Sequence, residues 1–190
     1  MSSHHIVKDQ QEPALYIEKA ISSKDYELIS NLLEWSPIVI VNENSLDFAL
    51  TWNIKIDVVL CSYENIENVK EQVIFQFPIE LITCEYPTRR NAFDFLKRKD
   101  HYALNIFQID FSTNDLTKVI DEELKIVFFN NEKHAFYCEN KWEKWLPKNR
   151  KIEFITKTMS TVLTTEKEGF YDKKDENGFW IMEYFNDDLN

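Results

Sequence analysis

Glycine is almost absent from this chain. Gly169 and Gly178 are the two glycines among 190 residues, whereas glycine makes up roughly 7% of an average protein. Phosphate-binding loops of the Walker and G-x-G-x-x-G types need glycine, because only a bare backbone lets its N–H groups come close to a phosphate. Neither loop can therefore exist in the first 168 residues.

Excess positive charge and long apolar runs are missing as well. The chain has 22 basic and 33 acidic residues, which gives a formal net charge of −11. This charge repels nucleic acid phosphates and anionic membranes. No apolar run approaches the roughly 18 residues of a membrane span, and the start MSSHHIVKDQQEP is too polar for a signal peptide. We expect a cytoplasmic protein that binds neither nucleic acid nor membrane.

Residues that bind transition metals or act as nucleophiles are few. Cys61, Cys84 and Cys138 are widely spaced and form no C-x-x-C pair, so we interpret them as buried free thiols in a reducing compartment. His101 and His134 have no cysteine or second histidine at ligand spacing, and we expect surface or strand positions for them. No G-x-S-x-G motif supports a nucleophilic serine.

What the chain does contain is a globular composition with a repeating strand and helix pattern. Hydrophobic residues make up 44% and aromatic residues 14% of the sequence, which is typical of a folded protein. Short apolar runs alternate with helix-period stretches, as in βαβ units around a parallel sheet. The predicted strands are Ala14–Ile17, Ile38–Val41, Val58–Cys61, Ile79–Thr83 and Leu104–Gln108, and the predicted helices are Lys24–Trp35, Ser45–Trp52 and Arg89–Lys99, the last with Thr88 as N-cap.

The pattern changes near residue 124. From Lys125 onward the segments KIVFF, KHAFYC, RKIEFITKT, MSTVLTT and GFWIMEYF are β-rich and separated by polar breaks. Alternation of this kind predicts a small antiparallel module. We therefore place a domain boundary between residues 124 and 125, so that an α/β part spans 1–124 and a β part spans 125–190.

Several segments follow one another in a recognisable order. They are the leader SSHHIVKDQQEPAL, the strand–helix–strand segment SPIVIVNENSLDFALTWNIKIDVVL, the helix segment PTRRNAFDFLKRKDHYALNIF and the Trp-containing segment KWEKWLP. Their order and spacing resemble the thiamine pyrophosphokinase family, over most of residues 1–157. The resemblance implies a Rossmann-like parallel sheet domain in residues 1–124. It also implies a shortened, β-sandwich-like thiamine-binding domain in residues 125–190.

The resemblance also implies an activity and its partners. The family reaction converts ATP and thiamine to AMP and thiamine diphosphate with Mg²⁺, and the family commonly forms homodimers through the sandwich domain. For this chain, ATP, thiamine and Mg²⁺ are therefore the implied small molecules, and a homodimer is the implied assembly. The Trp-containing segment places Trp142 and Trp145 at a ligand pocket, although packing in the core or at a dimer interface explains two tryptophans equally well.

The family's acidic motifs are largely replaced in this chain. The acidic turn falls on Glu43-Asn44-Ser45, an aspartate is retained as Asp57, the Gly-Asp-Phe-Asp motif falls on Cys61-Ser62-Tyr63-Glu64, and the Thr-Asp pair falls on Pro87-Thr88. The resemblance thus points to Glu43, Asp57, Glu64 and Thr88 as vestigial metal or nucleotide residues. Mg²⁺ demands near-octahedral oxygen ligands, and a misplacement of about 1 Å can cost on the order of 10²-fold in rate. We expect weak or lost catalysis.

Three readings remain open from the sequence. In the first, the site is degenerate and its carboxylates are solvated. In the second, Glu43, Asp57 and Glu64 lie together at the carboxyl ends of neighbouring strands and form a rebuilt metal cluster. In the third, the chain is a non-enzymatic ligand-binding or protein-interaction module on the same fold. The basic residues at the ends of the Arg89–Lys99 helix can receive an anion or simply solvate the helix and complement its dipole.

Overall fold

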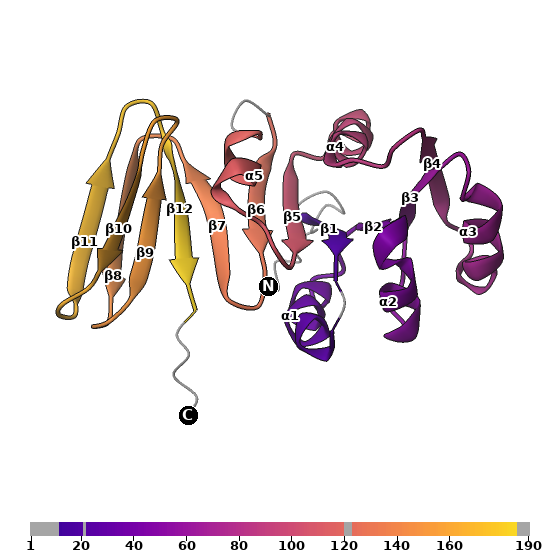
Figure 1. The fold of residues 1–190 in the computed structure, drawn as a ribbon, viewed down its shortest axis with the longest axis horizontal. Helices are drawn as coiled ribbons and strands as arrows, with labels where there is room; N and C mark the ends of the chain where they lie inside the picture. Colours follow the sequence, from indigo (N-terminus) through magenta and orange to yellow (C-terminus); the bar gives the residue numbers. More distant parts are fainter. Residues whose placement is uncertain (1–11, 21, 120–122, 186–190) are drawn as a thin grey trace, which may run out of the picture. The chain divides into compact units, whose positions relative to one another are not determined.

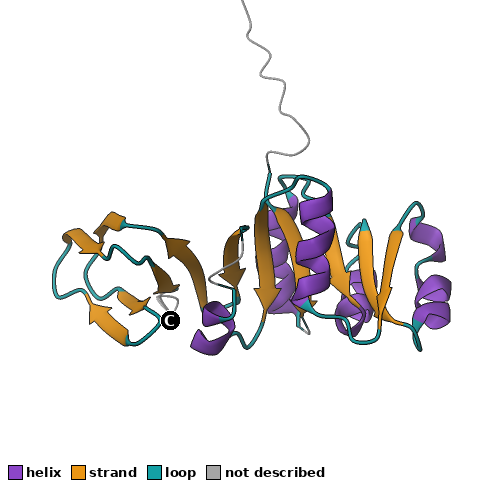
Figure 2. Ribbon diagram, turned by 90° about the horizontal axis from the view of Figure 1, so that it is seen from above, coloured by secondary structure: helices purple, strands orange, loops and turns teal. Residues whose placement is uncertain are grey.

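A computed structural model describes residues 12–20, 22–119 and 123–185 of the chain. Residues 1–11 of the polar leader lie outside the described residues. Contacts divide the chain into two compact units, Met1–Phe107 and Gln108–Asn190. Figure 2 contrasts the helix-rich first unit with the strand-rich second unit. The predicted domain boundary lies between residues 124 and 125, whereas these contacts group residues 108–124 with the second unit.

The first unit is a parallel sheet with helices on both faces (Figure 1). Its strands run in the order β5-β1-β2-β3-β4, and the β1–β2, β2–β3 and β3–β4 pairs are parallel. The elements are β1 (Ala14–Lys19), α1 (Ser23–Leu33), β2 (Val39–Asn42), the 3₁₀ turn η1 (Glu43–Ser45), α2 (Leu46–Thr51), β3 (Val58–Ser62), α3 (Ile66–Gln72), the 3₁₀ turn η2 (Ile74–Gln76), β4 (Glu80–Cys84), α4 (Arg89–Arg98) and β5 (Ala103–Gln108).

Strand order decides which helices cover which face. From β1 to β4 the chain moves in one direction across the sheet, and from β4 it returns to β5 beside β1. Right-handed crossovers then put α1 and α2 on one face and α4 on the other, as Figure 1 shows. The central strands are apolar and buried on both faces, which is what a doubly covered parallel sheet requires.

The second unit is an antiparallel β-sandwich preceded by a short helix. One layer has the strand order β10-β9-β12-β7-β6, and the other pairs β11 with β8. The core between the layers includes Trp142, Phe154 and Phe179. The elements are α5 (Thr113–Thr117), β6 (Lys125–Phe129), β7 (Lys133–Cys138), β8 (Lys141–Leu146), β9 (Lys151–Ile155), β10 (Ser160–Thr164), β11 (Gly169–Lys174) and β12 (Phe179–Tyr184).

The predicted fold class is confirmed. All five predicted strands and all three predicted helices of the first unit are present with shifts of a few residues at their ends. The sequence reasoning missed the helices α3 and α5, and it did not identify β8 and β11 as strands. Both strands mix aromatic and charged residues, since their outer faces meet solvent. Within the described residues, no helix is long and apolar enough to cross a membrane.

Candidate functional site

Topology indicates where a ligand site belongs in the first unit. In open α/β sheets ligands bind outside the carboxyl ends of the strands, where neighbouring strands lead to connections on opposite faces. Here the strand order reverses at β1, because β2, β3 and β4 follow on one side of it and β5 returns to its other side. We define the carboxyl edge as the carboxyl ends of β1, β2 and β3 with the start of α4, and we describe its polar residues in turn.

The most strongly linked pair at the carboxyl edge is Glu18 with Arg89. Glu18 ends the buried part of β1, and Arg89 opens α4. Arg89 Nε lies 2.7 and 2.9 Å from the two carboxylate oxygens of Glu18. The side chains are only 14% and 20% exposed for Arg89 and Glu18 respectively. The positive charge of Arg89 is therefore balanced by a carboxylate of its own chain, which weakens its attraction for a phosphate.

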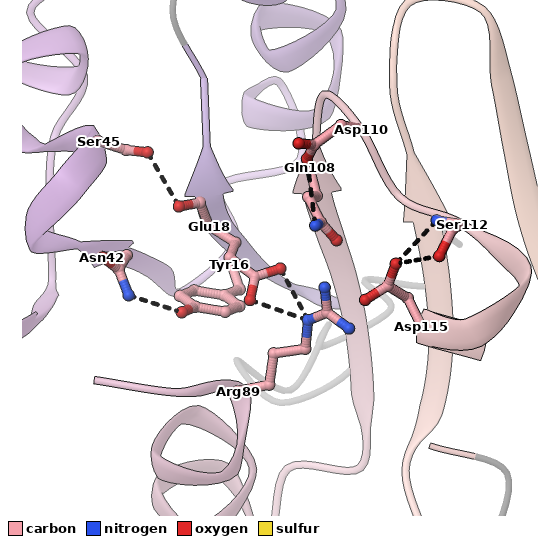
Figure 3. Close-up of polar contacts among 9 residues, drawn as sticks. All are labelled: Tyr16, Glu18, Asn42, Ser45, Arg89, Gln108, Asp110, Ser112 and Asp115. Atoms are coloured by element: carbon pink, nitrogen blue, oxygen red, sulfur yellow. Dashed lines mark hydrogen bonds and ion pairs between the residues drawn. The ribbon is translucent and has the colours of Figure 1, made fainter. Parts of the chain in front are cut away.

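Two further hydrogen bonds close the space between β1 and the turn after β2 (Figure 3). Asn42 Nδ2 donates to the Tyr16 hydroxyl at 3.2 Å, and Ser45 Oγ donates to the backbone oxygen of Glu18 at 3.1 Å. Burial raises the pKa of Tyr16 above its ordinary value, and the Glu18 carboxylate adds to that shift. The phenol therefore stays protonated at physiological pH and cannot act as a base.

Glu43, in the turn after β2, connects that turn to the end of β3 through hydrogen bonds. A single oxygen, Oε2, accepts hydrogen bonds from Ser62 N at 3.0 Å, Ser62 Oγ at 3.2 Å and Asn65 Nδ2 at 3.1 Å. Three donors leave that oxygen little capacity to bind a metal ion. The Cys61-Ser62-Tyr63-Glu64 loop, where the resembled family carries its aspartates, thus provides donors to a carboxylate instead of ligands to a cation.

Asp57 lies at the opposite end of the sheet. It immediately precedes β3, and its Oδ2 accepts a hydrogen bond from Val39 N at 2.9 Å. Its backbone also links β2 and β4, because Asp57 N donates to Val39 O and Glu80 N donates to Asp57 O. The expectation that Glu43, Asp57 and Glu64 all lie at carboxyl ends is therefore wrong for Asp57, which aligns the amino ends of the strands.

Glu64 and Thr88 stay at the carboxyl edge but make no cluster with Glu43. Glu64 follows β3 and is exposed. Thr88 is the N-cap of α4, as predicted, and both its N and its Oγ1 donate to Asn91 Oδ1 at 2.9 and 3.0 Å. Across residues 12–20, 22–119 and 123–185, no group of three or more His, Cys, Asp or Glu side chains is arranged to hold a metal ion. The described residues of the carboxyl edge therefore offer no preformed cluster of three or more such ligands for Mg²⁺.

The two tryptophans of β8 face opposite ways. Trp142 is 7% exposed and packs edge-on against Phe154 in the sandwich core. Trp145 is 49% exposed and pairs across strands with Phe170. A pocket lined by both side chains is therefore excluded by their alternation along the strand, and Trp142 has the core role that the sequence left open.

The second unit has polar contacts of its own near its start. Asp115 Oδ2 accepts from both the N and the Oγ of Ser112 at 2.8 Å, which caps α5, and Gln108 Nε2 donates to Asp110 Oδ1 at 3.3 Å (Figure 3). These contacts order the backbone that leads into α5.

The histidines and cysteines have structural environments. His101 is buried, contrary to the expected surface or strand position, and its Nε2 accepts from Ala14 N at 3.0 Å. His134 lies on β7 beside the buried carboxylate of Glu183, and burial lowers the pKa of His134 although Glu183 opposes the shift. The three cysteines are free thiols, as predicted, but only Cys61 of the three is buried, and Cys84 and Cys138 are half-buried. Burial raises the pKa of Cys61 and Cys84, so these thiols are poor nucleophiles.

Comparison with known proteins finds the fold and little sequence similarity. No family model matches the chain, and no curated protein matches it. Among solved structures, thiamine pyrophosphokinase from Bacillus subtilis is similar with a TM-score of 0.65 and 10% identity, over 91% of this chain and 99% of that chain. The enzyme from Geobacillus thermodenitrificans gives 0.63 and 8%, over 93% and 100%. Yeast thiamin pyrophosphokinase gives 0.53 and 8%, over 94% and 88%. The chain therefore has the thiamine pyrophosphokinase fold, which confirms the predicted resemblance at the level of structure.

Proposed function

We propose that this chain is a degenerate relative of the thiamine pyrophosphokinases, with weak or lost transfer of pyrophosphate from ATP to thiamine. The proposal rests on the hydrogen bonding of Glu43, whose Oε2 accepts three hydrogen bonds from Ser62 and Asn65. A carboxylate in a magnesium site is held so that its oxygens face the ion. Here the retained carboxylate joins two strand ends.

The other side chains of the carboxyl edge support the same proposal. Pyrophosphoryl transfer needs cations that neutralise the charge developing on the phosphates. Arg89, a cation at this edge, is paired with Glu18 on a neighbouring strand. The first 168 residues also contain no glycine with which a loop could wrap phosphate oxygens.

The enzymatic alternative retains ATP, thiamine and Mg²⁺ as ligands and uses Glu43 and Glu64 as the remaining carboxylates. Thiamine diphosphate formation by the purified chain, with magnesium and ATP in excess, tests it directly. We expect no product above the uncatalysed background, under conditions in which the Bacillus subtilis enzyme is active. Product that disappears in Glu64→Ala but persists in the Glu67→Ala control would overturn the proposal.

A ligand-binding or protein-interaction role on the same fold is the second candidate. It is favoured by the amino ends of β2 and β3, where aromatic side chains line a hollow instead of packing in the core. The cytoplasmic location and the homodimer implied by the resemblance stay predictions. Size-exclusion chromatography with light scattering measures the assembly.

A further inference from the structure

A second concave surface lies in the first unit, at the end of the sheet opposite to the carboxyl edge. It is a hollow of about 660 Å³ at the amino ends of β2 and β3. We call it the amino-edge hollow. Its lining comes from the segment before β1, from α1, and from the two loops that lead into β2 and β3: Glu12, Tyr26, Leu33, Trp35, Ser36, Pro37, Ile38, Val39, Trp52, Asn53, Ile54, Lys55 and Asp57.

The walls of the amino-edge hollow are aromatic. Trp52 stacks face to face on Tyr26, with ring centroids 4.5 Å apart and an interplanar angle of 13°. The stack joins α1 to the end of α2, which lie side by side on one face of the sheet (Figure 1). Trp35 is 67% exposed and Trp52 is 36% exposed. Two exposed indoles lining one hollow are unusual for a surface without a binding role, because grouped apolar exposure is normally avoided.

The charges around the hollow favour a cation. The half-buried carboxylates of Asp57 and Glu12 line it, and Lys55 is the cation found among its described lining residues. Asp57 uses Oδ2 to accept from Val39 N, which fixes the carboxylate in place without neutralising its charge.

The helix ends add a weaker contribution, because Leu33 O, Ala49 O and Leu50 O already accept hydrogen bonds from Ser36 N, Ile54 N and Asn53 N. Leu33, the last residue of α1, and Trp52, the C-cap of α2, both line the hollow. The last carbonyls of a helix carry partial negative charge. Neither helix, each described over its whole length, has a basic residue in its last turn to offset that charge.

We propose that the amino-edge hollow binds an alkylated organic cation, of the quaternary ammonium class, against the exposed parts of the Trp35 and Trp52 indoles. Indole faces attract weakly hydrated cations, and Asp57 and Glu12 supply the countercharge. A phosphate or carboxylate ligand would be repelled by the same groups. This site shares no residue with the carboxyl edge, so it stands independently of the proposed function.

The probe is choline, with its neutral isostere 3,3-dimethylbutan-1-ol as the matched ligand. Binding is followed by the indole N–H signals of a ¹⁵N-labelled full chain, up to about 20 mM ligand, because a millimolar dissociation constant is within reach at that concentration. We expect choline to shift the signals of Trp35 and Trp52 in a saturable way. The isostere should bind at least about five-fold more weakly, since it lacks the charge that the indoles and carboxylates attract.

Three variants locate the site. Trp35→Ala removes an exposed ring, and Asp57→Asn keeps an acceptor for Val39 N while removing the charge, so both should fold. Each should weaken choline binding by at least about five-fold. Trp145→Ala, which removes another exposed tryptophan, from the second unit, should leave binding unchanged. Choline that fails to bind, binds no better than the isostere, or binds Trp35→Ala as tightly as the native chain would each overturn the proposal.

Discussion

The carboxylates at the two ends of the parallel sheet in the first unit differ in how they are held by the rest of the chain. At the carboxyl edge, Glu18 and Glu43 are each held by donors from a neighbouring strand or helix. At the amino ends, Asp57 accepts one backbone hydrogen bond, and beside it two tryptophans remain exposed. The comparison shows that a carboxylate at the expected position is not by itself evidence of a metal ligand. Its oxygens must first be checked for hydrogen bonds and ion pairs within the chain.

The contrast has a physical basis. A carboxylate that leaves water needs compensation from charge or hydrogen bonds. Ser62 and Asn65 supply that compensation to Glu43 from within the chain. On our proposal the carboxyl edge is part of the structural framework, whereas the amino-edge hollow has the surface properties expected of a binding site.

The largest expected effect comes from breaking the ion pair at the carboxyl edge. Arg89→Ala removes the guanidinium that is paired with the partly buried Glu18 carboxylate, and should lower the free energy of unfolding by about 2 to 3 kcal/mol. The adjacent Arg90 forms an exposed pair with Asp94, so Arg90→Ala should cost only about 0.5 kcal/mol. Urea unfolding followed by circular dichroism measures both. Equal losses in the two variants would show that the carboxyl edge is not closed by this pair.

Removal of the Glu43 carboxylate comes next. Glu43→Ala leaves the donors of Ser62 and Asn65 without their acceptor, and should cost about 1.5 to 2 kcal/mol of unfolding free energy. The control Glu64→Ala removes an exposed carboxylate of the same edge and should change stability by less than about 0.5 kcal/mol. Magnesium should leave the Tm of the native chain unchanged in the same experiments. A rise in Tm with magnesium that is lost in Glu43→Ala would argue for a metal ligand.

Substitutions of Asp57, at the amino ends of the strands, should lower the free energy of unfolding by a smaller amount. Asp57→Ala leaves Val39 N without its acceptor and should cost about 1 kcal/mol, while Asp57→Asn retains an acceptor and should cost about 0.5 kcal/mol or less. Thermal melts of the two variants separate the hydrogen bond from the charge. If both variants lose the same amount, the negative charge itself stabilises the amino ends.

The smallest effect on stability is expected at the hollow. Trp35→Ala should change the free energy of unfolding by no more than about 0.5 kcal/mol, because most of the side chain is already in water. Trp142→Ala, in the sandwich core, should cost about 3 kcal/mol or more for the cavity that it leaves. A large loss of unfolding free energy in Trp35→Ala would mean that the Trp35 indole packs against the rest of the fold and is not available to a ligand.

Much of the fold could be predicted from local patterns. Apolar runs such as Val58, Val59 and Leu60 mark buried parallel strands, and Thr88 after Pro87 marks the start of α4. The short helix α3 was missed because a seven-residue element carries little periodicity. The strands β8 and β11 were missed because they form the small outer layer, where solvent permits charged side chains between the aromatics.

The site was harder to predict than the fold. Glu43 and Glu64 follow the carboxyl ends of β2 and β3, as expected, but Asp57 precedes its strand and therefore lies at the other end. Glu18 was missed, although a charged residue directly after the buried run of β1 is a signal that could have found it. Its pairing with Arg89 joins residues 71 positions apart, and sequence alone gives no register for such a contact.

Our central claim is that the side chains of the carboxyl edge are paired with each other and do not bind magnesium–ATP or thiamine. Its most direct test is isothermal titration of the purified chain with magnesium–ATP, followed by a separate titration with thiamine. With Glu43 and Arg89 already occupied by their own chain, we expect no binding heat for either ligand up to millimolar concentration. Binding of both at micromolar affinity, about −8 kcal/mol, would contradict that expectation and show that the edge opens to accept the substrates of the fold's known enzymes.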